Sequence, residues 1–242
     1  MSLRRIDGGG DVLILCDHAS NRVPDDIDLG IETALLDRHI AVDLGAADVT
    51  AALAGLLDAP AILAGVSRLV IDLNREPDHP GLIPIASDGH AVPGNAGASR
   101  GDRIARFYAP YHHAIAAQIR ARRPGLVIAV HSFTPQLEQG QATARPWQVG
   151  LLYNRDGRAA RIAIDALRDA GIRTGDNEPY SGRQLNVTMN RHAEANGIPY
   201  LAFEIRNDLI GEPLGVAHWA QLLARIANDV RNRLAQTRAV AT

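Results

Sequence analysis

Short apolar runs alternate along the chain with longer stretches of helical periodicity. The runs are rich in β-branched residues and predict buried strands over residues 12–16, 61–64, 69–73, 126–131, 149–153 and 199–205. The longer stretches predict helices over residues 43–57, 102–122, 158–170 and 218–234. Because strands alternating with helices are typical of a sheet covered on both faces, we expect an α/β fold. The prediction is a three-layer α/β/α sandwich around a largely parallel mixed sheet, as a single domain over residues 1–242.

One segment, residues 76–98, has a different character. It contains Pro77, Pro80, Pro84 and Pro93 together with several glycines. This composition predicts a long loop, and long loops in compact domains are commonly functional or mobile. Two interpretations stay open, a lid over a binding site and an ordinary surface loop.

Composition narrows the class of protein. The chain has 242 residues, 46% of them hydrophobic, which suffices for one sizeable core. Its net charge of -2 gives no reason to expect binding to nucleic acid or to an anionic membrane, and no apolar run approaches the roughly 20 residues that span a bilayer. The one cysteine, Cys16, excludes an intrachain disulfide and a cysteine-based zinc cluster. We expect a cytoplasmic protein and leave a homo-oligomer open.

Chemistry-bearing side chains gather where the predicted strands end. His18 follows the first strand, His131 ends the strand that starts near residue 126, and Glu204 lies in the last strand. Ligands of α/β sheets bind beyond the carboxyl ends of the strands, so we expect these side chains to meet at one edge. Catalytic zinc takes three His and carboxylate ligands and keeps a water in an open position. A nearby carboxylate then carries the proton, and an arginine stabilises the oxyanion.

Each of these residues also has a plainer interpretation. A histidine after a strand is often a hydrogen-bonded turn residue. The Glu204 carboxylate lies in an apolar strand and needs a partner, which Arg206 on the same face could supply as a structural ion pair. Asn74 and Arg75 could simply begin the loop that follows them. Two histidines with one carboxylate would also suit non-haem iron.

Six short segments carry a resemblance to a known family. They are Asp17-His18-Ala19-Ser20-Asn21 with Val23-Pro24, Asp43-Leu44-Gly45, Ser67-Arg68-Leu69-Val70-Ile71-Asp72-Leu73-Asn74-Arg75, Pro110-Tyr111-His112, His131-Ser132-Phe133 and Phe203-Glu204-Ile205-Arg206. Together and in this order, they make the chain resemble the N-formylglutamate amidohydrolase family from about residue 11 to residue 210. That family is similar to the zinc carboxypeptidases, so the resemblance implies a zinc-exopeptidase, phosphorylase/hydrolase-like fold.

The resemblance also implies roles for individual residues. His18 and His131 correspond to zinc ligands, and Glu204 corresponds to the general base. Arg68 or Arg75 would stabilise the oxyanion or hold a substrate carboxylate, with Asn74 assisting. The implied cofactor is one Zn²⁺ per chain.

The third metal ligand is where the chain departs from the carboxypeptidase pattern. Those enzymes carry a Glu three residues after the first His, whereas this chain has Asn21, and a neutral amide is a poor zinc ligand. Asp43 is our candidate, because it lies in a matching segment between the two histidines; its alternative role is to N-cap the helix that follows. Asp17 is a weaker candidate, since adjacent strand residues point to opposite faces.

Further candidates complete the predicted site. His112 could bind substrate or act as a second proton carrier, or be a solvated helix-face histidine, and Arg103 could neutralise a substrate carboxylate. The turn at residues 180–183 could face the site. Better-known family members carry a Pro-His-Ser-Gly type motif where this chain has Asp-His-Ala-Ser-Asn, which leaves the exact substrate open.

The predicted activity is metal-dependent hydrolysis of the N-formyl or N-acyl amide bond of N-formyl-L-glutamate or a similar small anionic N-acyl amino acid. Such a reaction belongs to amino-acid degradation, as in histidine catabolism. The alternatives are a deacylase for another N-acyl amino acid, a small zinc carboxypeptidase, and a non-catalytic small-molecule binding protein on the same fold. Neither nucleic acid nor a membrane is an expected partner.

Overall fold

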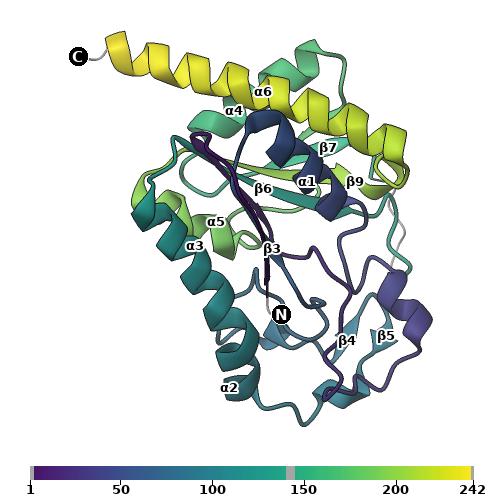
Figure 1. Ribbon diagram of the computed structural model, residues 1–242. Coiled ribbons are helices and arrows are strands. Elements are labelled where there is room, and N and C mark those ends of the chain that lie inside the picture. Colours follow the sequence, from purple (N-terminus) through teal and green to yellow (C-terminus); the bar gives the residue numbers. More distant parts are fainter. Residues whose placement is uncertain (1–2, 140–144, 241–242) are drawn as a thin grey trace.

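A seven-stranded sheet forms the centre of the molecule (Figure 1). The computed structural model describes residues 3–139 and 145–240. Across the sheet, the strands are β1 (Leu3–Ile6), β3 (Ala61–Ala64), β2 (Val12–Cys16), β6 (Leu126–Phe133), β9 (Tyr200–Arg206), β7 (Val149–Leu152) and β8 (Thr174–Asp176). The strands from β3 to β9 are parallel, whereas β1 is antiparallel to β3 and β7 is antiparallel to β9. The predicted largely parallel mixed sheet is confirmed.

Helices cover both faces of this sheet (Figure 1). One face carries α1 (Ala46–Leu57), α4 (Arg158–Asp169) and α6 (Pro213–Val240), and the other carries α3 (Ala109–Ala121) and α5 (Val187–His192). Every residue of β2, β3 and β7 is buried, because both sides of these strands pack against helices or loops. Burial on both faces explains why the strands are apolar throughout rather than alternating. The predicted α/β/α sandwich is therefore confirmed.

The strand predicted over residues 69–73 is wrong, although these residues are buried. The carbonyl of Ser67 accepts hydrogen bonds from the N–H groups of Val70 and Ile71, at 2.9 and 3.3 Å, and the Ser67 hydroxyl accepts from the N–H of Leu69 at 3.1 Å. These bonds fold the segment into turns that put its apolar side chains in the core without joining the sheet. A short apolar run does not distinguish a strand from a buried turn by itself.

The helix predicted over residues 102–122 is interrupted. α2 (Arg100–Arg103) passes into a π turn at Ile104–Tyr108 before α3 begins. Pro110 lies at the start of α3, and because proline has no N–H, the regular bonding pattern cannot run through it. The sequence pattern also missed the short elements β1, β8 and α5.

The proline-rich segment at residues 76–98 contains a small hairpin of β4 (Ala86–Ser87) and β5 (His90–Ala91). The Asn95 side chain fastens the segment to the core, because its Nδ2 donates to the carbonyl of Leu69 at 2.8 Å. The lid interpretation stays a prediction. Of the described helices, none is both long and apolar enough to cross a membrane.

Candidate active site

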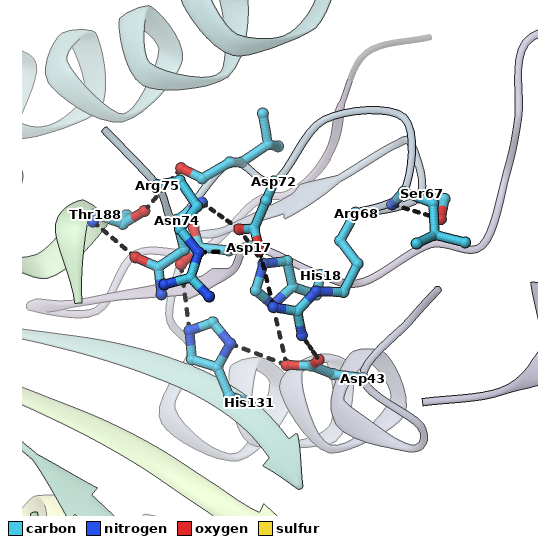
Figure 2. Close-up of polar contacts among 12 residues, drawn as sticks. Asp17, His18, Asp43, Ser67, Arg68, Asp72, Asn74, Arg75, His131 and Thr188 are labelled. Atoms are coloured by element: carbon cyan, nitrogen blue, oxygen red, sulfur yellow. Dashed lines mark hydrogen bonds and ion pairs between the residues drawn. The ribbon is translucent and has the colours of Figure 1, made fainter. Parts of the chain in front are cut away.

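The carboxyl ends of β2 and β6 bring two histidines to one carboxylate (Figure 2). His18 lies just after β2, and His131 lies in β6. Oδ2 of Asp43 is 3.3 Å from Nδ1 of His18 and 2.9 Å from Nδ1 of His131, and all three side chains are buried. The alternative role of Asp43 as a helix cap is not observed, because Gly45 is the N-cap residue of α1.

Each histidine has a second carboxylate at its other ring nitrogen. Nε2 of His18 lies 2.8 Å from Oδ1 of Asp72, and Nε2 of His131 lies 3.2 Å from Oδ2 of Asp17. The second contact has the distance of an ion pair but not the direction of a hydrogen bond. The hydroxyl of Tyr111 donates to the other oxygen of Asp17 at 2.7 Å and holds that carboxylate in place. A carboxylate at Nε2 favours the tautomer that carries its proton there, which leaves the lone pair of Nδ1 directed at Asp43.

This arrangement fits a bound cation. Two imidazole lone pairs and a carboxylate oxygen repel one another at these distances unless a positive charge lies between them. In the protein alone, ring protons provide that charge: burial lowers the pKa of His131, but Asp17 and Asp43 outweigh it and hold the pKa well above its usual value. A metal ion can take the place of those protons. His18, Asp43 and His131 offer ligand atoms within 4.8 Å of one another, and two histidines with a carboxylate are a ligand set of catalytic zinc.

Two arginines lie near the same centre and differ in how strongly they are bound to its carboxylates. Arg68 bridges two carboxylates, with Nη1 3.2 Å from Oδ1 of Asp43 and Nη2 2.8 Å from Oδ2 of Asp72. Among the described residues, the Arg75 side chain forms one ion pair, with Nε 3.7 Å from Oδ2 of Asp72. The guanidinium of Arg75 is therefore the one with more capacity for a bound anion.

Glu204 projects from β9 beside this centre. It is the register partner of His131 on the neighbouring strand and is 7% exposed. Its Oε2 has no hydrogen-bond partner among the described residues. Burial, assisted by the negative charge of Asp43, raises the pKa of Glu204 to about 7. The ion pair considered between Glu204 and Arg206 does not form, because Arg206 bonds Asp208 at 2.7 Å. A carboxyl group with this pKa can both accept and release a proton near neutrality.

A small cavity of about 120 Å³ joins these groups. Its lining consists of ten charged or polar side chains and one leucine: His18, Asp43, Arg68, Asp72, Asn74, Arg75, His131, Ser132, Tyr180, Leu185 and Glu204. Asn74 is held in place because its Oδ1 accepts the backbone N–H of Thr188 at 2.9 Å (Figure 2). The structure thus brings together seven of the nine residues predicted for the site.

The other two predicted residues, His112 and Arg103, lie outside the cavity. Nδ1 of His112 is 2.8 Å from Nε2 of His192, and its Nε2 is 3.0 Å from the carbonyl of Leu73. Arg103 is buried and donates to the carbonyl of Val70 at 2.7 Å. Both side chains hold the backbone that leads to Asn74 rather than facing the cavity.

Four residues that line the cavity were not among the predicted site residues: Asp72, Ser132, Tyr180 and Leu185. Asp72 stands in a buried apolar run, and a charge in such a run is itself a sign of a specific partner. Tyr180 belongs to the turn at residues 180–183, which the sequence suggested could face the site, and its side chain is part of the cavity lining. Asn21, by contrast, points away and donates to Asp37 at 2.8 Å.

Fold and site together define a class of protein: an α/β enzyme with a polar, charge-lined cavity at the carboxyl edge of its sheet. The chain belongs to the N-formylglutamate amidohydrolase family, whose sequence profile matches residues 10–211. The protein is therefore a hydrolase of the amidohydrolase type, and the resemblance noted in the sequence is confirmed.

Solved structures share the fold of this chain. The chain is similar to a gene product of Agrobacterium tumefaciens, with 29% identity and a TM-score of 0.91 over 97% of this chain and 96% of the other. It also shares its fold with the N-formylglutamate amidohydrolase of Ralstonia eutropha JMP134, with 18% identity and a TM-score of 0.66 over 98% and 99% of the two chains. No curated protein sequence matched the chain.

Proposed function

We propose that the protein hydrolyses the N-formyl amide bond of N-formyl-L-glutamate, or the N-acyl bond of a similar small anionic amino acid, with the help of one bound zinc ion. One observation carries this proposal: the convergence of His18 and His131 on Asp43, directly beside a carboxyl group with a pKa of about 7. Family membership supports the class of reaction.

His18, Asp43 and His131 would hold the metal. When bound there, a zinc ion supplies Lewis acidity, which polarises an amide oxygen and makes a water molecule easier to deprotonate. The carboxylates of Asp72 and Asp17 keep the two rings in the tautomer and orientation that this requires.

Glu204 moves the proton. Its carboxylate accepts a proton from the attacking water as the new carbon–oxygen bond forms. The same carboxyl group then donates that proton to the amide nitrogen as the carbon–nitrogen bond breaks. A pKa near neutrality suits both steps, because neither proton transfer is then strongly uphill. The products are formate, or another short carboxylate, and a free amino acid, and we propose that the reaction serves amino-acid degradation.

The two arginines neutralise the negative charges of the substrate and of the transition state. Arg75, with its single long contact to Asp72, is the binding group for a substrate carboxylate, and the planar guanidinium suits two oxygens at once. Arg68 stays fixed between Asp43 and Asp72, and its positive charge stabilises the oxyanion that develops during the attack.

A substrate panel with metal removal tests the proposal. The purified protein is assayed on N-formyl-L-glutamate, N-acetyl-L-glutamate, N-formyl-L-norvaline and a dipeptide ending in glutamate, before and after chelation and after addition of one equivalent of zinc. We expect N-formyl-L-glutamate to be turned over best, with loss of activity on chelation and recovery with zinc. Zinc-dependent cleavage of the dipeptide alone would replace the proposal with a carboxypeptidase. Absence of turnover throughout would refute it.

A further inference from the structure

Tyr180 lies in the lining of the cavity and is held there by close backbone packing. Its segment crosses directly over β7, where Gly150 is the register partner of Glu204. A Cβ atom at Gly150 would lie only 1.8 Å from the carbonyl oxygen of Glu178, so the segment can reach this position only because residue 150 is glycine. The segment is thereby placed next to the strand position that carries Glu204.

The side chain of Asn177, which belongs to the same segment, also holds the segment in place. Oδ1 of Asn177 accepts the backbone N–H groups of Tyr153 and Gly182, both at 3.0 Å, which closes the turn around Tyr180. A Cβ at Gly182 would meet the backbone nitrogen of Tyr153 at 2.4 Å, so this approach is also close. The phenol is consequently presented to the cavity by a segment fastened at both ends.

The hydroxyl group of Tyr180 is set up as a donor. Nη1 of Arg145 donates a hydrogen bond to the phenol oxygen at 3.0 Å. The guanidinium of Arg145 also lies over the aromatic rings of Tyr180 and Phe133, at 5.0 and 6.0 Å from the ring centres. Because the arginine uses a lone pair of the oxygen, the hydroxyl hydrogen stays free to donate, and no described residue accepts it. An adjacent positive charge makes this O–H a stronger donor.

The surroundings of the hydroxyl point to the reacting atoms. Burial and the negative charge of Glu204 raise the pKa of Tyr180, so the phenol keeps its proton at neutral pH. Tyr180 shares the cavity lining with Glu204 and Arg68, whose guanidinium is already bound to two carboxylates. An uncharged donor beside the proton carrier is suited to an oxygen that gains charge during the reaction, and less suited to a fixed carboxylate, for which Arg75 is available.

We propose that the Tyr180 hydroxyl donates a hydrogen bond to the substrate's amide oxygen as it becomes the oxyanion, with Arg145 as the positioning residue behind it. This inference rests on the proposed amide hydrolysis. It assigns the cavity two oxyanion donors, the charge of Arg68 and the hydroxyl of Tyr180. An interaction that strengthens in the transition state affects kcat more than KM.

The test is steady-state kinetics of Tyr180→Phe on the best substrate of the wild-type protein, together with its zinc content. We expect kcat to fall about 100-fold, with KM changed by less than about two-fold and zinc unchanged. Arg145→Gln should lower kcat by a smaller factor, and Arg145→Lys should restore part of it. Tyr153→Phe is the matched control, because its hydroxyl bonds Asp176 outside the cavity and its loss should leave kcat and KM unchanged.

The outcomes separate this inference from the proposed function. An active wild type with an equally active Tyr180→Phe overturns the inference and leaves the hydrolysis proposal standing. A rise of KM alone also overturns it, because the hydroxyl would then bind the ground state. A wild type inactive on every N-acyl substrate, with or without zinc, refutes both together.

Discussion

Among the described residues, two groups of side chains have the residue types and spacing that could hold a metal ion, and they differ in burial and in hydrogen bonding. The buried cluster consists of His18, Asp43 and His131, and the surface cluster consists of His39, Asp88 and Glu138. The buried cluster lines the cavity beside Glu204, whereas His39 and Asp88 of the surface cluster are half-buried and Glu138 is exposed.

The difference lies in how hydrogen bonds are completed. In the surface cluster, His39 pairs with Asp88 at 2.9 Å, and the two carboxylate oxygens of Glu138 bond Arg38 and His90. Each of these groups therefore has a hydrogen-bond or ion-pair partner within the protein. In the buried cluster, both rings aim at one carboxylate oxygen while their outer nitrogens face other carboxylates. This centre needs a positive charge, which ring protons or a metal ion can supply. Composition and spacing therefore do not identify a metal site unless ring orientation and burial agree with them.

Removing one histidine from each cluster should give the largest contrast. His131→Asn is expected to lose the bound zinc and to reduce hydrolysis to background, because a ligand of a three-ligand site is gone. His39→Asn is the matched change in the surface cluster and should keep one zinc per chain and full activity. Metal analysis by mass spectrometry, with the substrate assay, measures both. Two equivalents of zinc in the wild type, with one lost in His39→Asn, would contradict the distinction between the clusters.

Replacing a glutamate in each region, Glu204 beside the buried cluster and Glu138 in the surface cluster, should give the next largest effect. Glu204→Gln is expected to lower kcat roughly 100- to 10,000-fold, because the amide cannot carry the proton, while the zinc content stays unchanged. Glu138→Gln in the surface cluster should leave kcat within error of the wild type. A Glu204→Gln enzyme with near-normal kcat would assign the proton transfer to another group.

The sequence predicted the parts of the site that depend on local pattern. His18, His131 and Glu204 could be found because each stands at or near the end of an apolar strand, and parallel strands end at one edge. The sheet interior was predicted for the same reason. Edge strands were missed: β1 is only partly buried, and β8 has three residues, so neither makes an apolar run.

Other parts of the site depend on packing between distant segments. Asp72 lies in the segment wrongly predicted as a strand, and its contact with His18 joins residues 54 positions apart in the sequence. Tyr180 reaches the cavity only because glycines at positions 150 and 182 let its segment lie against β7. His112 was predicted for the site, but its side chain bonds the carbonyl of Leu73 instead. Helical periodicity cannot tell a histidine that faces the cavity from one that bonds a neighbouring loop. Such placements follow from tertiary contacts rather than from local propensity.

The outer carboxylates should have a smaller effect than the ligands themselves. Asp72→Asn removes the negative charge that orients His18 and makes its Nδ1 a stronger ligand, so zinc affinity is expected to fall about 10- to 100-fold. Asp88→Asn, which alters the corresponding partner of His39, should leave zinc affinity unchanged. Competition with a chelator of known affinity gives both values. Equal affinities in Asp72→Asn and the wild type would mean that the carboxylate serves only to hold Arg68.

The smallest of these contrasts concerns the arginines of the two regions and the stability of the metal-free protein. Arg68 bonds both Asp43 and Asp72, so Arg68→Met leaves these two buried carboxylates without their shared partner in the metal-free protein. The Arg68 side chain is 27% exposed, so water partly screens this interaction. Discounted for that exposure, the expected loss is about 2 kcal/mol in the free energy of unfolding. Arg38→Met removes an exposed pair with Glu138 and should produce no measurable change. Urea unfolding in the presence of a chelator measures the free energy of unfolding of both variants.

Adding zinc should reduce the difference in free energy of unfolding between Arg68→Met and Arg38→Met, since the metal then supplies the positive charge that Asp43 has lost. A gap that zinc does not narrow would mean that Arg68 stabilises the fold independently of the cation site, and the electrostatic link between the arginine and the metal would have to be abandoned.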